Sequence, residues 1–344
     1  MPDSARGTGV LPARRRPGRG GLYPRAASGV LLLVLLLCAP AAPLGAEPGP
    51  AEPTATDWSF ELKTKVLMDS FTAYEFGMPL PPQYAPLSRL EFEMDSVWAG
   101  FSARRRLDRF SLGLEYLSSS LRQEGGHMRD SDWEDPADTG RLTTFSKSEC
   151  TLRPSFQISA DLDMQAADLL GLGPEWDLRP FVGFRLQELS FLAHDGTQWE
   201  YDPPYTVTPL PGHSIAFRQT WRQYFLGLAL GYDWGPVLGL RHFKTTGRAD
   251  VAYVQGDNRD DHLLRPDRIT REETEGYAVH AVLGLTLGLA ENLDLGLEGE
   301  YLGIETTGVH KLHDGWVGLD MQWNKGVHVW SRQTSLQLSL AYSF

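Results

Sequence analysis

Cysteine is scarce in this sequence of 344 residues, which contains only Cys38 and Cys150. Cys38 lies in an N-terminal segment that we expect to be removed, so Cys150 is left without an intramolecular partner. The mature chain therefore cannot form an internal disulfide. Cys150 also lacks a recognisable paired base, which argues against cysteine-protease chemistry.

Long hydrophobic runs are lacking too, apart from "GVLLLVLLLCAPAA" near the N-terminus. This run follows six arginines and precedes small residues, which is the order of a secretory signal peptide. We expect residues 1–46 to be cleaved and the proline-rich stretch 47–56 to lead into one folded domain, 57–344. No other segment approaches the ~20 apolar residues of a membrane-spanning helix.

Basic residues are outnumbered in the part of the chain that remains after this cleavage. It holds 26 Lys and Arg against 43 Asp and Glu, a formal charge of −17. Such a balance argues against nucleic acid as a partner. It favours cationic peptides or proteins as substrates, because a negative field raises their local concentration.

The dominant pattern after residue 56 is alternation with a period of two, which is typical of β-strands. In "TSLQLSLAYSF" at the C-terminus, leucines and aromatic residues alternate with polar ones. About ten such segments of ten or more residues follow one another, longer than most strands of soluble proteins. The pattern predicts an all-β fold, a ten-stranded antiparallel transmembrane β-barrel.

The connections between these segments alternate in expected length. Short ones fall near 104–108, 165–175, 233–236 and 290–292, and long polar ones near 76–87, 122–148, 196–212, 257–270 and 306–332. Short periplasmic turns and long extracellular loops are the plan of a bacterial outer-membrane barrel. We therefore expect outer-membrane lipid around the barrel.

Two of the long segments carry acidic motifs, and both are expected on the outer side. "GGHMRDSDWEDP" contains Asp130 and Asp132, and "GDNRDDHLLRPDRIT" contains Asp260 and His262. Residues i and i+2 of a strand share a face, so each pair can act together. Two close carboxylates tend to share a proton, and a carboxylate beside a histidine orients the ring as a general base.

Together these motifs resemble the omptin family of outer-membrane endoproteases, and "YEFGMPLPPQYAPLSRLEF" resembles that family's first hairpin. The resemblance implies that Asp130 and Asp132 hold and polarise a nucleophilic water. It makes His262 the general base and Asp260 the group that orients it, with the active site facing the extracellular side. No metal, cofactor or covalent intermediate is expected.

The resemblance also implies acidic residues that bind a basic side chain next to the scissile bond. A gapless match places Glu75 at one such position. The other is expected two residues before Asp260, where this chain has Asn258. One extra residue, Arg259, precedes "DDH", so a bulge would let Asp257 take the role. The family's lipopolysaccharide-binding pattern is poorly matched, although Arg218 and Arg222 offer basic groups, and lipopolysaccharide stays open as an activator.

Other functions remain open at this point. Taken singly, each acidic motif could be a solvated loop, and "DNRDDH" could be a weak Ca²⁺ site because clustered carboxylates suit hard cations. A non-enzymatic barrel, such as an adhesin, would need neither motif. An outer-membrane lipid hydrolase of the Ser/His type would need a serine near His262.

Overall fold

The computed structural model describes residues 58–119, 123–237, 239–265 and 267–344. The expected signal peptide 1–46 and lead-in 47–56 lie outside them. The strands are β1 (Trp58–Met78), β2 (Tyr84–Glu93), β3 (Ser96–Leu107), β4 (Phe110–Ser119), β5 (Gln123–Asp132), β6 (Thr144–Leu152), β7 (Ser155–Met164), β8 (Trp176–Glu200), β9 (Thr206–Asp233), β10 (Phe243–His262), β11 (Arg268–Ala290), β12 (Leu293–Asp314) and β13 (Leu319–Ser343). A short 3₁₀ helix, η1 (Asp168–Leu170), precedes β8.

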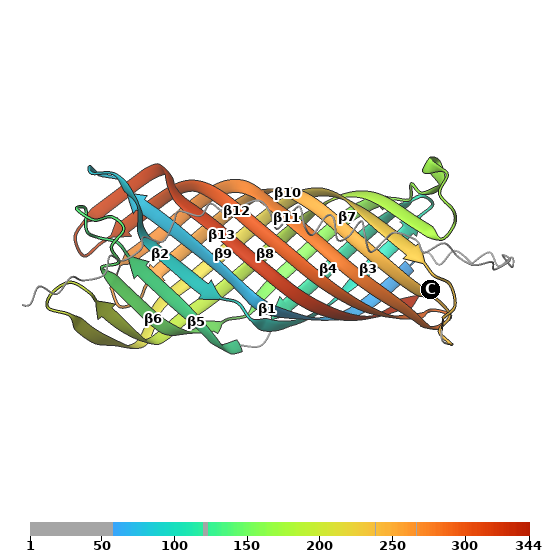
Figure 1. Ribbon diagram of the computed structural model, residues 1–344, viewed down its shortest axis with the longest axis horizontal. Helices are drawn as coiled ribbons and strands as arrows, with labels where there is room; N and C mark the ends of the chain where they lie inside the picture. The colour runs from blue at the N-terminus through green and yellow to red at the C-terminus, as the bar shows by residue number, and fades with distance from the viewer. Residues whose placement is uncertain (1–57, 120–122, 238, 266) are drawn as a thin grey trace, which may run out of the picture.

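All thirteen strands form one antiparallel sheet that closes on itself, because β13 pairs with β1 (Figure 1). The sheet contains two overlapping circuits of ten strands. One runs through β1, β2, β5, β6 and β8–β13, and the other through β1, β3, β4, β7 and β8–β13. The predicted all-β architecture with a ring of ten strands is thus confirmed, and closure leaves no long unpaired edge.

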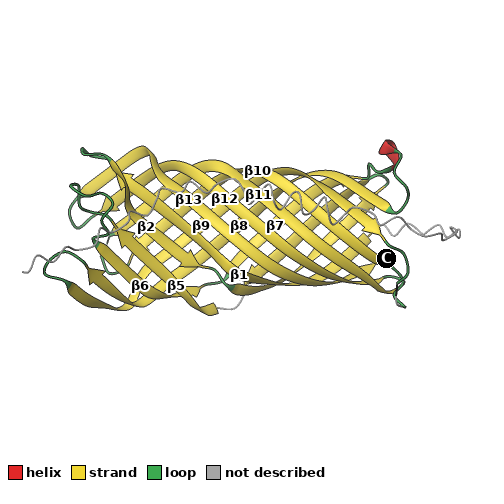
Figure 2. Cartoon of the chain, in the orientation of Figure 1, coloured by secondary structure: helices red, strands yellow, loops and turns green. Residues whose placement is uncertain are grey.

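The prediction of long loops was wrong. Most residues assigned to them continue the strands, so that β12 and β13 are joined by residues 315–318 and β8 and β9 by residues 201–205 (Figure 2). These ends look like loops in the sequence because their outer faces are polar. The alternation nevertheless persists there, with inward-facing residues packed inside the cylinder.

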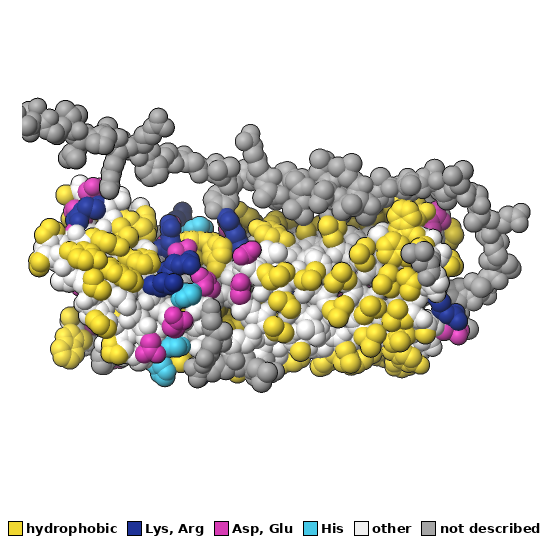
Figure 3. Space-filling view, turned by 60° about the horizontal axis from the view of Figure 1, so that its bottom comes forward, with side chains coloured by type: hydrophobic (Ala, Val, Ile, Leu, Met, Phe, Trp, Pro, Cys, Tyr) yellow, Lys and Arg dark blue, Asp and Glu magenta, His cyan; other side chains and the backbone are white. Residues whose placement is uncertain are grey.

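Exposed hydrophobic side chains cover the half of the cylinder away from the acidic motifs, and charged side chains gather between that half and the opposite end (Figure 3). Outward-facing members include Phe60, Leu62, Phe101, Leu112, Leu226, Leu228, Leu336, Leu338 and Leu340. Three exposed tyrosines on β9, β10 and β11, which are Tyr224, Tyr253 and Tyr277, are cross-strand neighbours. No helix among the described residues is long and apolar enough to cross a membrane.

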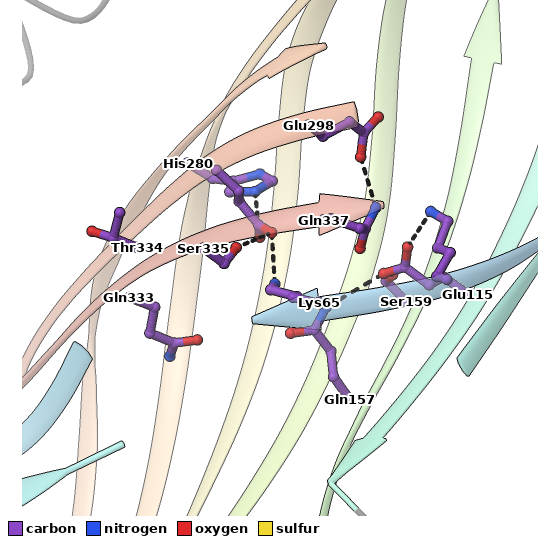
Figure 4. Close-up of polar contacts among 12 residues, drawn as sticks. Lys65, Glu115, Gln157, Ser159, His280, Glu298, Gln333, Thr334, Ser335 and Gln337 are labelled. Atoms are coloured by element: carbon purple, nitrogen blue, oxygen red, sulfur yellow. Dashed lines mark hydrogen bonds and ion pairs between the residues drawn. The ribbon is translucent and has the colours of Figure 1, made fainter. Parts of the chain in front are cut away.

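The interior of this half is polar and occupied by hydrogen-bonded side chains (Figure 4), which surround a cavity of about 320 Å³. Lys65 forms an ion pair with Glu300 at 2.6 Å, and Gln337 donates a hydrogen bond to Glu298 at 2.7 Å. Such filling is expected of a small barrel. Between it and the acidic motifs lies a fully buried aromatic layer, in which Phe92 stacks on Phe217 with centroids 4.5 Å apart. This layer supports the site above it.

Candidate active site

Asp130 and Asp132 lie at the end of β5, where β5 pairs with β2. Their cross-strand neighbours are Leu90 and Ser88, respectively. The hydroxyl of Ser88 donates a hydrogen bond to Oδ1 of Asp130 at 3.3 Å. Both carboxylates are half-buried, so the strand presents them on one face, as the i, i+2 spacing predicts.

Asp260 and His262 lie at the end of β10, between β9 and β11. Asp260 is completely buried, whereas the side chain of His262 is 19% exposed. Nε2 of His262 lies 3.9 Å from Oδ1 of Asp260, too far for a hydrogen bond. Oδ1 has no hydrogen-bond partner among the described residues, so this oxygen is available to accept a hydrogen bond.

The two motifs line one cavity of about 480 Å³ at the end of the cylinder away from the hydrophobic band. Asp130 and Asp132 form part of one wall, and His262 contributes to the other. The remaining charged groups on its lining are Glu134, Glu200, Asp202, Arg265 and Arg268. The structure therefore brings together residues that are 130 positions apart in the sequence, around a space large enough for water molecules.

The carboxylates of this site have raised pKa values. Burial raises the pKa of Asp132 to about 6. The pKa of Asp130 is raised well above its ordinary value, first by burial and then by the negative charges of Asp132 and Asp260. At neutral pH this pair can therefore share one proton.

The pKa values of His262 and Asp260 are shifted in opposite directions. Burial lowers the pKa of His262 to about 3, and the positive charges of Arg268 and Arg265 act in the same direction. Burial raises the pKa of Asp260 to about 7, although a hydrogen bond from Tyr74 opposes this shift. The imidazole is thus neutral at pH 7 and able to accept a proton.

Tyr74 is the residue of the site that sequence reasoning missed. Its hydroxyl donates a short hydrogen bond to Oδ2 of Asp260, and its side chain is 1% exposed. It lies on β1, which is not a hydrogen-bonded neighbour of β10. The only signal in the sequence is the inward alternation of Thr72, Tyr74 and Phe76, which identifies no partner.

Glu75 and Asp257, the expected binders of a basic side chain, are not part of this cavity. Both lie on the outer faces of their strands, where Glu75 forms an ion pair with Arg89 at 2.7 Å and Asp257 pairs with Arg222. Glu75 pairs with Arg89 in the regular part of the β1–β2 register, and it faces outward because it lies between the inward-facing Tyr74 and Phe76. The expected bulge is also absent, because β10 pairs with β11 without a shift through Asp257.

The structure also gives the arrangement of potential metal ligands and the positions of the arginines on β8 and β9. Among the described residues, no three or more His, Cys, Asp or Glu side chains are arranged to hold a metal ion. Arg218 and Arg222 lie on the outer face of β9, whereas Arg185 on β8 points inward and donates a hydrogen bond to Gln223. The two arginines of β9 therefore point away from the interior of the cylinder.

Comparisons with known proteins agree with this architecture. A family model described as "Omptin family" matches residues 86–307. The structure is similar to that of the outer membrane protease OmpT from Escherichia coli, with a TM-score of 0.75 and 15% identity over 86% of this chain and 99% of that chain. OprG from Pseudomonas aeruginosa matches with a TM-score of 0.30 and 11% identity over 84% and 97% of the two chains. A search of curated proteins finds no match.

Proposed function

The chain belongs to the omptin family, and from this premise we propose that it is an outer-membrane endopeptidase that cleaves peptide bonds next to basic residues. Family membership supports the general class, an outer-membrane protease. One observation carries the proposal further. Asp130, Asp132 and His262 line a single cavity, and Oδ1 of Asp260 lies 3.9 Å from Nε2 of His262.

In the proposed mechanism, a water molecule is held between the two walls of the cavity. The Asp130–Asp132 pair accepts hydrogen bonds from this water through whichever oxygens are unprotonated. His262, neutral at pH 7, takes a proton as the water attacks the peptide carbonyl, and ionised Asp260 stabilises the imidazolium that forms. The proton then passes to the leaving amine, so no covalent intermediate is formed.

The preference for cationic substrates is supported by charge. The chain after residue 46 carries a net −17, and three further carboxylates line the cavity, those of Glu134, Glu200 and Asp202. The positive charges of Arg265 and Arg268 offset these carboxylates only in part. A peptide in the cavity therefore meets a predominantly negative surface, which attracts basic side chains over long range.

The proposed location follows from the distribution of apolar surface. We place the exposed hydrophobic half of the cylinder in the outer membrane and the end that carries the cavity on the extracellular side, with tyrosines such as Tyr253 near the interface. We also propose lipopolysaccharide as an activator that contacts exposed Arg218 and its neighbours on β9. Activity measured with and without added lipopolysaccharide tests this part.

The function is tested with refolded protein in detergent and a quenched peptide that contains a dibasic site. We expect cleavage by the wild type and losses of at least about a hundredfold for Asp130→Ala, Asp132→Ala and His262→Ala. Asp138→Ala, which changes an exposed carboxylate outside the cavity, serves as the matched control. Full activity in the three site variants would contradict the mechanism, and an inactive, folded wild type would favour a non-enzymatic barrel.

A further inference from the structure

An inward-facing arginine, Arg268, lies beside the proposed general base. Asp261 of β10 pairs with Ile269 of β11, so the next position of this antiparallel register sets Arg268 across from His262. Cβ atoms of directly opposite residues are roughly 5 Å apart. Both side chains line the cavity that also contains Asp130 and Asp132. Arg268 therefore presents a positive charge at the place where water and a peptide carbonyl would meet.

The guanidinium of Arg268 is only loosely paired. Its one ion pair among the described residues joins Nη1 to Oδ2 of Asp314 at 3.7 Å, which is longer than a hydrogen bond. Asp314 is not part of the cavity lining. Nε of Arg268 is buried and has no hydrogen-bond partner among the described residues. Buried donors are rarely left unsatisfied, so this guanidinium has donors available for a negatively charged group in the cavity.

The position of Arg268 is unfavourable for proton abstraction alone. Burial lowers the pKa of His262 to about 3, and the charge of Arg268 adds to this shift. A cation next to a general base weakens the base, because it repels the proton that the base must accept. Arg268 also forms no ion pair with Asp130, Asp132 or Asp260 among the described residues. Its charge is therefore left to act on something other than the catalytic side chains.

Peptide hydrolysis creates a negative charge that the four proposed catalytic residues do not neutralise. When the water oxygen bonds to the carbonyl carbon, the π electron pair of the carbonyl moves to its oxygen and one water proton moves to His262. The shared proton leaves one negative charge on the Asp130–Asp132 pair, and Asp260 carries another, so both repel the new oxyanion. Hydrogen-bond donors held in place near such an oxygen usually make a large contribution to catalysis.

Arg268 is the better placed of two candidates for this task. Arg265 and Arg268 are the Lys or Arg side chains on the cavity lining among the described residues. Arg265 lies in the turn between β10 and β11, whereas Arg268 begins β11. A residue held in a strand directly opposite His262 keeps its distance to the reacting atoms, which is what a preorganised donor requires.

We propose that Arg268 is a catalytic residue that binds the oxyanion of the tetrahedral intermediate. Its guanidinium donates hydrogen bonds to the former carbonyl oxygen as that atom becomes negative. The electron pair then re-forms the carbonyl, the C–N bond breaks, and His262 returns its proton to the leaving amine, while Arg268 stays protonated throughout. This inference rests on the proposed function and adds to it a group that stabilises the transition state.

The test measures kcat and KM on a quenched dibasic peptide at about pH 9, on the plateau of the pH profile. The plateau is needed because Arg268 also lowers the pKa of Asp260 against the larger effect of burial, so its removal shifts the acid limb. For Arg268→Gln we expect kcat to fall at least about a hundredfold with little change in KM. Arg268→Lys keeps the charge without the planar fork of donors and should lose less. Arg271→Gln, an exposed residue of the same strand, is the matched control and should equal the wild type.

Two other roles for Arg268 give different results. If the arginine only tunes the pKa values of Asp260 and His262, Arg268→Gln will shift the acid limb but reach the wild-type plateau. If it binds a carboxylate of the substrate, the loss will appear in KM and only on a peptide with Glu after the scissile bond, not on the matched Gln peptide. Either result would overturn the inference, as would a kcat as low for Arg271→Gln as for Arg268→Gln.

Arg268→Lys decides the matter if Arg268→Gln fails to fold, as judged by heat modifiability on gels. A plateau kcat at least about tenfold below wild type in Arg268→Lys would then support the inference, and an unchanged plateau kcat would overturn it. A folded wild type that cleaves none of the peptides would instead contradict the proposed function.

Discussion

The hydroxyl of Tyr74 donates a hydrogen bond to the carboxylate of Asp260 across the inside of the cylinder, although the two residues are 186 positions apart in the sequence. This contact fixes one oxygen of Asp260, so that the other is directed toward His262 at 3.9 Å. Tyr74 therefore acts through Asp260 rather than on substrate.

Replacement of Tyr74 by Phe removes this donor while it keeps the aromatic ring. The hydrogen bond lowers the pKa of Asp260 against the effect of burial, so its loss raises that pKa. We expect the acid limb of the pH profile of kcat/KM to move upward by on the order of one unit, with a lower rate at pH 7. Tyr277→Phe removes a similar hydrogen bond to Glu305 on the outer face and should leave the limb in place. An unmoved limb in Tyr74→Phe would show that the contact is only structural.

The wild-type pH profile reports on the same residue. Activity requires ionised Asp260 and neutral His262, whose pKa values are about 7 and about 3. The proton on His262 is lost well below neutrality, so Asp260 controls the acid limb. We expect kcat/KM to rise between about pH 6 and pH 8. A profile that is already flat from pH 4 upward would contradict this assignment.

Asp260 should also reduce the stability of the folded protein at neutral pH. Its folded-state pKa of about 7 lies above the ordinary 3.8, so the folded state binds a proton more tightly than the unfolded state. The contribution of Asp260 to stability is therefore greatest at low pH and declines as pH rises from about 4 to 7. Asp260→Asn should stabilise the protein more at pH 8 than at pH 5. Denaturant unfolding in detergent measures this, and an equal effect at both values would contradict it.

Ionic strength should affect the cleavage of cationic peptides. The acidic cavity and the net charge attract basic substrates over distances that salt screens, with a Debye length of about 10 Å at 0.1 M. We expect kcat/KM for a dibasic peptide to fall severalfold between low and 0.5 M salt. A neutral peptide should change little, and equal changes for both would point to an effect of salt on the barrel itself.

The sequence was sufficient to predict the ring of ten strands and the faces of the acidic pairs, because both depend on local alternation. Asp130 with Asp132 and Asp260 with His262 are i, i+2 pairs, which a strand must present together. The contact of Tyr74 with Asp260 could not be found in this way, since it depends on closure of the ring.

The misplacement of Glu75 and Asp257 has a different cause. A shift of one residue in strand register moves a side chain to the opposite face. On β1, Glu75 lies one residue from the inward-facing Tyr74 and Phe76 and therefore faces outward, and β10 lacks the bulge that was expected before Asp260. The polar outer faces of the strand ends likewise made these extensions look like loops in the sequence. Register irregularities depend on packing between distant segments, so local patterns do not reveal them.

The most direct test of the account is a double-mutant cycle between the two walls of the cavity, with kcat/KM measured on one dibasic peptide. If Asp132 and His262 act on the same water, Asp132→Ala and His262→Ala should each lose at least about a hundredfold, and the double variant should lose little more than either single one. Losses that multiply in the double variant, or wild-type activity in either single variant, would contradict a shared catalytic water.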